Sequence, residues 1–374
     1  MYDAIVIGAG GMGSATAYHL AKSGAKTLLL EQFHRGHTFG SSHGDTRIIR
    51  LVYEKQFYTE LMKSAYAEWR ALESVSGKAL MFVTGSVLIT PGGHEYSTSI
   101  RASLEAAGIE SEWWSPKQLA SRFPQFRIDK TQSVLWQKDT GFLHASECVL
   151  THLQLAEGHG AEFREQTAVT GIDWERDVPE VITEGGRLRA KKIVVTAGAW
   201  AKQLLSNLNL PLTVTRQQIV YYRPTDASLF QPDRFPIFID VTWDEFFYGF
   251  PVFGREGVKV ARHGKGQVVS PDTCNRTPDA EYIDHLRAFL KERIPDAAGE
   301  ALYAQVCLYT ETPDEDFIID AHPDCPDVLI ATGFSGHGFK FCGLVGRILS
   351  EMVREGQTRF DINPFRLDRF GEHL

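Results

Sequence analysis

The sequence has few cysteines and no pattern that would link them to one another or to a metal. The cysteines are Cys148, Cys274, Cys307, Cys325 and Cys342. Their odd number and wide spacing, with no Cys-x-x-Cys or Cys/His ligand pattern, indicate reduced thiols rather than a disulfide framework. We therefore expect no metal site.

Long apolar runs and a basic surplus are also missing from the 374 residues. No stretch approaches the roughly 20 apolar residues of a membrane-spanning helix. The formal net charge is −8, so no excess of cations exists to neutralise nucleic-acid or lipid phosphates. A strand-like run from Tyr2 leaves no room for a signal peptide. We expect a cytoplasmic protein that binds a small molecule, and neither nucleic acid nor a membrane.

The clearest motif lies in the first 31 residues. An apolar run, residues 2–7, leads into Gly-x-Gly-x-x-Gly, and a second apolar run, residues 27–30, ends at Glu31. Strand, glycine turn, helix, strand and acid in this order are typical of a dinucleotide-binding βαβ unit, and a chance glycine-rich surface turn rarely meets all these conditions. Glu31 would bind a ribose hydroxyl and repel a 2′-phosphate, which favours FAD or NAD over NADP.

Each glycine of the motif has a physical role. Gly8 would allow the tight turn, Gly10 would let the backbone approach a pyrophosphate, and Gly13 would let the helix pack closely on the strand. The free N–H groups of the helix that begins near Gly11 and Met12 would face the phosphates.

Two further stretches, residues 192–205 and 328–355, also read as strand, glycine-rich turn and helix. Because the three units are far apart in the chain, they predict one sheet built from distant segments. The intervening stretches are rich in aromatic and β-branched residues, which favours a mostly antiparallel sheet. We expect an α/β protein with two interleaved domains and the ligand in the crevice between them. The expected boundaries are 1–80, 142–212 and 310–374 for the dinucleotide domain, and 81–141 and 213–309 for the substrate domain.

Cationic residues stand in two unusual places. If the segment around Arg47 and Arg50 is helical, their spacing puts both guanidinium groups on one face, where they could clamp a carboxylate or pyrophosphate. Lys340 lies among aromatic and small residues at a helix start, where a cation is unfavourable unless an anion is near. Solvated surface cations are the alternative at both places.

Several stretches along nearly the whole chain resemble the family of monomeric sarcosine oxidase and N-methyltryptophan oxidase. The most specific are His-Gly-Asp-Thr-Arg-x-x-Arg, residues 43–50, and Ser-Gly-His-Gly-Phe-Lys-Phe, residues 335–341; the others are residues 8–13, 248–251, 307–310 and 314–320. Members are FAD-containing amine oxidases with a Rossmann-like nucleotide domain of glutathione-reductase type and a sheet-rich substrate domain. The resemblance implies oxidation of an N-methyl amino acid with O₂ as acceptor, hydrogen peroxide as product, and a monomer.

The same resemblance implies roles for particular residues. Cys307 would form a thioether to the 8α-methyl group of the flavin. Arg50 and Lys340 would bind the substrate carboxylate, and Arg47 would lie beside the flavin ring. The other residues expected at the cofactor are Ser42, His43, Thr46, Gly336, His337 and Gly338.

Lys259 matches the lysine that activates O₂ in this family, and His263 lines the substrate cavity. A strand lysine between two valines is costly to bury unless an electron-rich partner faces it. An ammonium facing the flavin would stabilise negative charge that develops during O₂ reduction. The remaining residues expected at the substrate are Ile239, Tyr248, Tyr309 and Thr310.

Departures from the family leave the substrate open. Ser42 replaces a usual histidine, residues 51–56 lack the family's His-Ala-Tyr-Gly-Glu-Gly loop, and Ile239 stands where sarcosine oxidases have methionine. Residues 364–370 are closer to N-methyltryptophan oxidases. The alternatives are an oxidase of fructosyl amino acids, an amine dehydrogenase with an acceptor other than O₂, and a non-catalytic FAD-binding protein.

Overall fold

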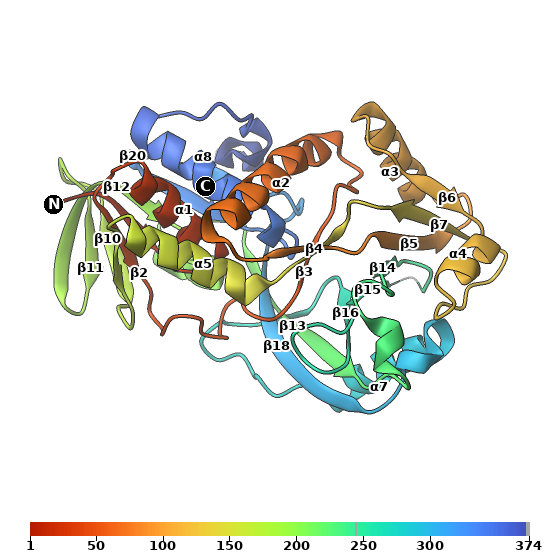
Figure 1. The fold of residues 1–374 in the computed structure, drawn as a ribbon. Helices are drawn as coiled ribbons and strands as arrows, with labels where there is room; N and C mark the ends of the chain where they lie inside the picture. Colours follow the sequence, from red (N-terminus) through yellow and green to blue (C-terminus); the bar gives the residue numbers. More distant parts are fainter. Residues whose placement is uncertain (244, 372–374) are drawn as a thin grey trace.

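The N-terminal motif forms the centre of an eight-stranded sheet in the computed structural model, which describes residues 1–243 and 245–371 (Figure 1). β1 (Tyr2–Ile7) lies between β2 (Thr27–Leu30) and β12 (Gly186–Val195), parallel to both. β12 pairs in parallel with β20 (Cys325–Thr332). The prediction that distant segments share one sheet is therefore confirmed. The remaining strands of this sheet are β9 (Glu162–Arg164), β10 (Val169–Asp173), β11 (Glu180–Thr183) and β19 (Ile318–His322).

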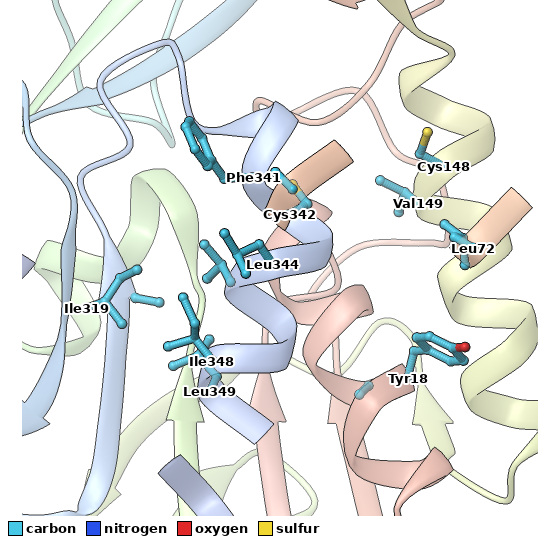
Figure 2. Packing of buried hydrophobic residues seen from close by; sticks show 14 of the residues in the cluster. Tyr18, Leu72, Cys148, Val149, Ile319, Phe341, Cys342, Leu344, Ile348 and Leu349 are labelled. Carbon is cyan, nitrogen blue, oxygen red and sulfur yellow. The ribbon is translucent and has the colours of Figure 1, made fainter. Parts of the chain in front are cut away.

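Helices from three parts of the chain pack together beside this sheet. α1 (Gly11–Lys22) contacts both α5 (Ala145–Gly158) and α8 (Cys342–Glu355), and α8 also contacts α2 (Gln56–Ser76). Figure 2 shows Ile348 of α8 near Ile319 of β19, while Tyr18 of α1 lies against α5. Burial of these apolar faces stabilises the position of the glycine motif, because α1 begins directly after it.

The second sheet has nine strands and is mostly antiparallel, as expected. β13 (Thr213–Tyr222) pairs along its length with β18 (Ala301–Glu311), and also with β16 (Val258–His263). The pair of β14 (Ile237–Asp240) with β5 (Ser86–Pro91) is parallel. The remaining strands are β6 (Glu112–Trp114), β7 (Gln132–Gln137), β15 (Phe246–Phe250) and β17 (Gln267–Val268), and the remaining helices are α3 (Glu95–Ala106), α4 (Pro116–Arg122), α6 (Ala201–Leu204) and α7 (Ala280–Arg293).

A three-stranded sheet made of β3 (Arg47–Ile49), β8 (Gly141–Leu143) and β4 (Met81–Val83) corrects one expectation. The segment that carries Arg47 and Arg50 is a strand and the residue after it, not a helix. Two consecutive isoleucines, Ile48 and Ile49, fit a strand because β-branched side chains pack well on a pleated surface. Helical spacing therefore does not bring the two arginines together.

The two large sheets agree with the expected two-domain α/β architecture, and the domain boundaries given above stay a prediction. No helix among residues 1–243 and 245–371 is long and apolar enough to cross a membrane.

The contact between α1 and α8 requires glycine at position 346. A Cβ there would lie 2.5 Å from the Ala15 carbonyl carbon and 2.7 Å from the Thr16 nitrogen. We expect Gly346→Ala to lower the free energy of unfolding by about 1–3 kcal/mol, because overpacking forces the helices apart. Gly158→Ala on α5 meets nothing within 4 Å and should be neutral or stabilising. Thermal and denaturant unfolding compare the two; equal stability would contradict the packing argument.

Candidate active site

A cavity of about 590 Å³ extends from the glycine motif to the nine-stranded sheet. The expected site residues that line it come from both large sheets and the loops between them. They are Gly8, Gly10, Gly11, Met12, Glu31, Ser42, His43, Thr46, Arg47, Arg50, Ile239, Tyr248, Lys259, His263, Cys307, Tyr309, Thr310, Gly336, His337, Gly338 and Lys340. Gly13 is the expected residue that is not in the lining.

The glycine turn has little room for side chains. Gly8 has φ of +97°, a left-handed conformation that glycine adopts without strain. A Cβ on Gly13 would lie 1.7 Å from the Gly8 carbonyl oxygen, so Gly13 serves the close packing of helix on strand. Thr196, which sequence reasoning did not single out, donates to the carbonyl oxygens of Ile7 and Gly8 at 2.8 and 3.0 Å. The signal that could have found it is its place between the apolar run and the glycine-rich turn of the predicted unit at residues 192–205.

Ser42 binds the first backbone N–H group of α1. Its hydroxyl oxygen accepts from the Gly11 N–H at 2.9 Å. The expectation that this N–H is free for phosphate is therefore wrong, because a nearby loop hydroxyl satisfies it. The loop that carries Ser42 is thereby joined to the dinucleotide motif.

Glu31 is buried at the end of β2 and holds two backbone groups. Its carboxylate oxygens accept from the N–H of Ala9 at 2.8 Å and of Phe33 at 3.1 Å. Burial acts to raise the pKa of Glu31, but hydrogen bonds from His37 and Ala9 outweigh it and hold the pKa below its ordinary value. Glu31 is therefore ionised at neutral pH, as an acceptor for ribose hydroxyls must be.

Two cations that line the cavity, Arg47 and Lys259, are stabilised by backbone oxygens. Arg47 donates to the carbonyl oxygens of Thr46 at 2.9 Å and His43 at 2.7 Å. Lys259 is 2% exposed and donates to the Thr46 carbonyl oxygen at 2.9 Å, with its ammonium 4.7 Å from the Phe250 ring centre. Burial and the Arg47 guanidinium hold the pKa of Lys259 well below its ordinary value.

Cys307 is buried on β18 and lines the same cavity. Burial raises the pKa of its thiol, and the opposing effect of Arg47 and Lys259 is smaller. The two cations do lower this pKa, but desolvation of the thiolate outweighs their attraction.

Near His263, the cavity is lined by Arg50 and Lys340. Among the described residues, Nη1 of Arg50 and Oγ1 of Thr310 are buried without a hydrogen-bond partner. The described residues place no carboxylate within ion-pair distance of Arg50 or Lys340. Burial, then the Lys340 and Arg50 charges, lowers the pKa of the nearby His263 to about 4, which makes it neutral at pH 7.

Aromatic rings shape this end of the cavity. The His263 ring lies 5.6 Å from that of Tyr309 and 5.3 Å from that of Phe246. Phe246 and Phe250 were not among the expected site residues, although both lie in the Phe-Phe-Tyr-Gly-Phe run of β15. The signal that could have found them is strand alternation, because residues two positions before and after Tyr248 lie on the same face of the strand as Tyr248.

The residues present fit an FAD molecule. The glycines of the turn put no side chain into the cavity that they line, and the ionised carboxylate of Glu31 also lines it. His43 is 7% exposed, lines the cavity, and has no partner for either ring nitrogen among the described residues. Burial, then the Arg47 charge, lowers its pKa to about 3, so a neutral ring with one donor and one acceptor is available to a ligand.

A dinucleotide cradle connected to a buried cationic pocket defines a flavin-dependent oxidoreductase. The chain belongs to the family described as "FAD dependent oxidoreductase", whose sequence pattern matches residues 3–352. It is therefore an FAD-dependent enzyme of the amine-oxidising type to which its relatives belong.

Similar proteins cover the chain from end to end. Monomeric sarcosine oxidase of Bacillus sp. (strain NS-129) is 39% identical over 98% of this chain and 97% of its own. N-methyl-L-tryptophan oxidase of Escherichia coli O139:H28 is 34% identical over 99% of both chains. Among solved structures, L-proline dehydrogenase from P. horikoshii superposes with a TM-score of 0.88 at 23% identity, covering 99% of this chain and 97% of that one, which shows the shared fold.

Glu31→Gln should weaken FAD binding. The amide replaces one acceptor oxygen with a donor, so one backbone N–H loses its partner, and we expect the dissociation constant to rise about tenfold or more. Glu165→Gln is the control, because that exposed carboxylate accepts from Arg35 and does not line the cavity. Titration of FAD into apoprotein in a Cys307→Ala background measures both; equal affinities would refute the role of Glu31.

Proposed function

We propose that this protein is an FAD-dependent oxidase of N-methyl amino acids such as sarcosine or N-methyltryptophan. It would convert the C–N bond of a secondary amine to an imine while O₂ is reduced to hydrogen peroxide. The observation that carries the proposal is the pair Arg50 and Lys340, two cations that have no anionic partner among residues 1–243 and 245–371. Both line a cavity that also contains the dinucleotide motif. The names of the relatives support it.

Arg50 and Lys340 would bind the substrate carboxylate through charge-assisted hydrogen bonds. Tyr248, Tyr309, Thr310 and Ile239 would complete the pocket. Because the pocket is buried and already cationic, it disfavours a protonated amine and favours the neutral amine that can react. The same burial and positive charges keep the His263 ring neutral, so it offers one hydrogen-bond donor and one acceptor rather than a base.

FAD would be held by the glycine turn, Glu31 and the loops at residues 42–47 and 336–338, with Cys307 as the covalent attachment. FAD held there would supply the acceptor for a hydride equivalent from the C–H bond beside nitrogen and the two electrons that reduce O₂. Lys259 would stabilise the negative charge that develops on oxygen, because its ammonium is held in a buried, water-poor site. Arg47 would lie beside the flavin ring.

Anaerobic mixing with amino acids tests this function. We expect sarcosine or another N-methyl amino acid to bleach the yellow colour, and air to restore it quickly with release of hydrogen peroxide. Bleaching only by fructosyl amino acids would show a deglycating oxidase instead. Slow recovery in air would show a dehydrogenase, and no bleaching by any of these compounds would refute the proposal.

Acid denaturation tests covalent attachment. The flavin should precipitate with the unmodified polypeptide, whereas Cys307→Ala should release it to the supernatant because the thioether sulfur is gone. Cys342→Ala is a matched control, since this second buried cysteine also lines the cavity. Release of flavin from the unmodified protein would exclude the bond to Cys307.

A further inference from the structure

Tyr53 contacts both cations of the carboxylate site from behind the cavity. Its side chain is 8% exposed and its hydroxyl accepts a hydrogen bond from Lys340 Nζ at 2.9 Å. The guanidinium carbon of Arg50 lies 5.0 Å from the centre of the Tyr53 ring, within the range of a cation–π interaction. One side chain therefore touches the two groups that would bind the substrate.

The directions of the hydrogen bonds around Tyr53 follow from its neighbour His337. Nε2 of His337 lies 3.0 Å from the Glu315 carbonyl oxygen, which can only accept, so Nε2 carries the hydrogen. Burial, then the Lys340 charge, holds the pKa of His337 well below its ordinary value, so the ring is neutral and Nδ1 is an acceptor. The Tyr53 hydroxyl donates to this Nδ1 at 3.2 Å and keeps its oxygen for Lys340.

Lys340 is held at three points. Its ammonium also donates to the His337 carbonyl oxygen at 2.6 Å, and Trp69 Nε1 donates to the Lys340 carbonyl oxygen at 2.7 Å. An ammonium has three N–H donors, and these contacts use two of them. One donor remains for a ligand.

We propose that Tyr53 is a positioning residue that fixes Arg50 and Lys340 as a pre-arranged pair for the substrate carboxylate. Two long cationic side chains repel each other and lose rotamer freedom when ordered. The ring and hydroxyl of Tyr53 offset both the repulsion and the loss of rotamer freedom before the substrate binds. Such pre-organisation raises the affinity for the substrate carboxylate. The proposal rests on the carboxylate site of the proposed function.

Tyr53→Phe in the holoenzyme isolates the hydroxyl, because the ring under Arg50 remains. The probe is methoxyacetate, which is sarcosine with oxygen in place of the N–H group and cannot be oxidised as an amine. We expect its dissociation constant to rise about tenfold, as befits a lost hydrogen bond to a charged group. Tyr58→Phe is the control: its ring stacks on Tyr53 at 5.0 Å, but its hydroxyl donates to Asp316 at 2.9 Å. It should change the dissociation constant by less than about twofold.

The pH dependence of binding separates positioning from a general structural effect. Five titratable or charged groups face Lys340. Arg50 stays charged, and the rings of His263 and His337 are neutral by pH 7. Burial raises the pKa values of the Tyr53 hydroxyl and the Cys342 thiol. Burial, then the Arg50 charge, lowers the pKa of Lys340 itself. The loss of affinity as the pH rises therefore reports deprotonation of Lys340. Removing an acceptor of its ammonium should move that loss to lower pH in Tyr53→Phe and leave it in place in Tyr58→Phe.

A double-mutant cycle with Lys340→Met completes the test. Tyr53→Phe should add little to the effect of Lys340→Met, because both remove the same contact. Full additivity, or a Tyr53→Phe protein that matches Tyr58→Phe in affinity and pH dependence, would overturn the proposal. Failure of the unmodified holoenzyme to bind methoxyacetate would overturn the carboxylate site and the role of Tyr53 together. Normal binding without oxidation of any N-methyl amino acid would overturn the proposed function alone.

Discussion

The constraint on which the rest of this structure depends is the burial of cations that have no carboxylate partner in the part of the chain that the structure describes. Removing a charge from water costs several kcal/mol unless hydrogen bonds replace the lost solvation. Here Arg47, Lys259 and Lys340 donate to carbonyl oxygens, and Arg50 lies over the ring of Tyr53. Oxygens and aromatic rings solvate these groups without cancelling their charge. The cavity therefore keeps a positive field for an anionic ligand.

This field requires loops and strands from both large sheets. The eight-stranded sheet contributes the turns after β1 and β20, at the carboxyl ends of parallel strands, where ligands of open α/β sheets bind. The nine-stranded sheet contributes Lys259 from β16 and Cys307 from β18. The loop before β3 joins them, because Thr46 accepts from Lys259 and Ser42 accepts from Gly11. One loop thus links the glycine motif to the nine-stranded sheet.

Local sequence was a good guide wherever backbone geometry leaves one choice. Position 8 requires a left-handed φ, and position 13 leaves no room for a side chain. The motif could therefore be interpreted without knowledge of the residues that pack against it. The valines on both sides of Lys259 likewise predicted a buried lysine in a strand, because the local strand pattern is enough to place this residue in a sheet. The motifs that resemble known oxidases indicated most of the remaining cavity residues, whose roles stay predictions.

What the sequence by itself determined is the dinucleotide turn, the α/β class and the set of cations, because these follow from short-range backbone and charge rules. Only the tertiary structure decided how the cations are held. It made the segment of Arg47 a strand, paired the Gly11 N–H with Ser42, and placed Tyr53 between Arg50 and Lys340. The contact of Gly11 with Ser42 joins residues 31 positions apart, and that of Tyr53 with Lys340 joins residues 287 positions apart. Their energies depend on burial and distance, which no local pattern encodes.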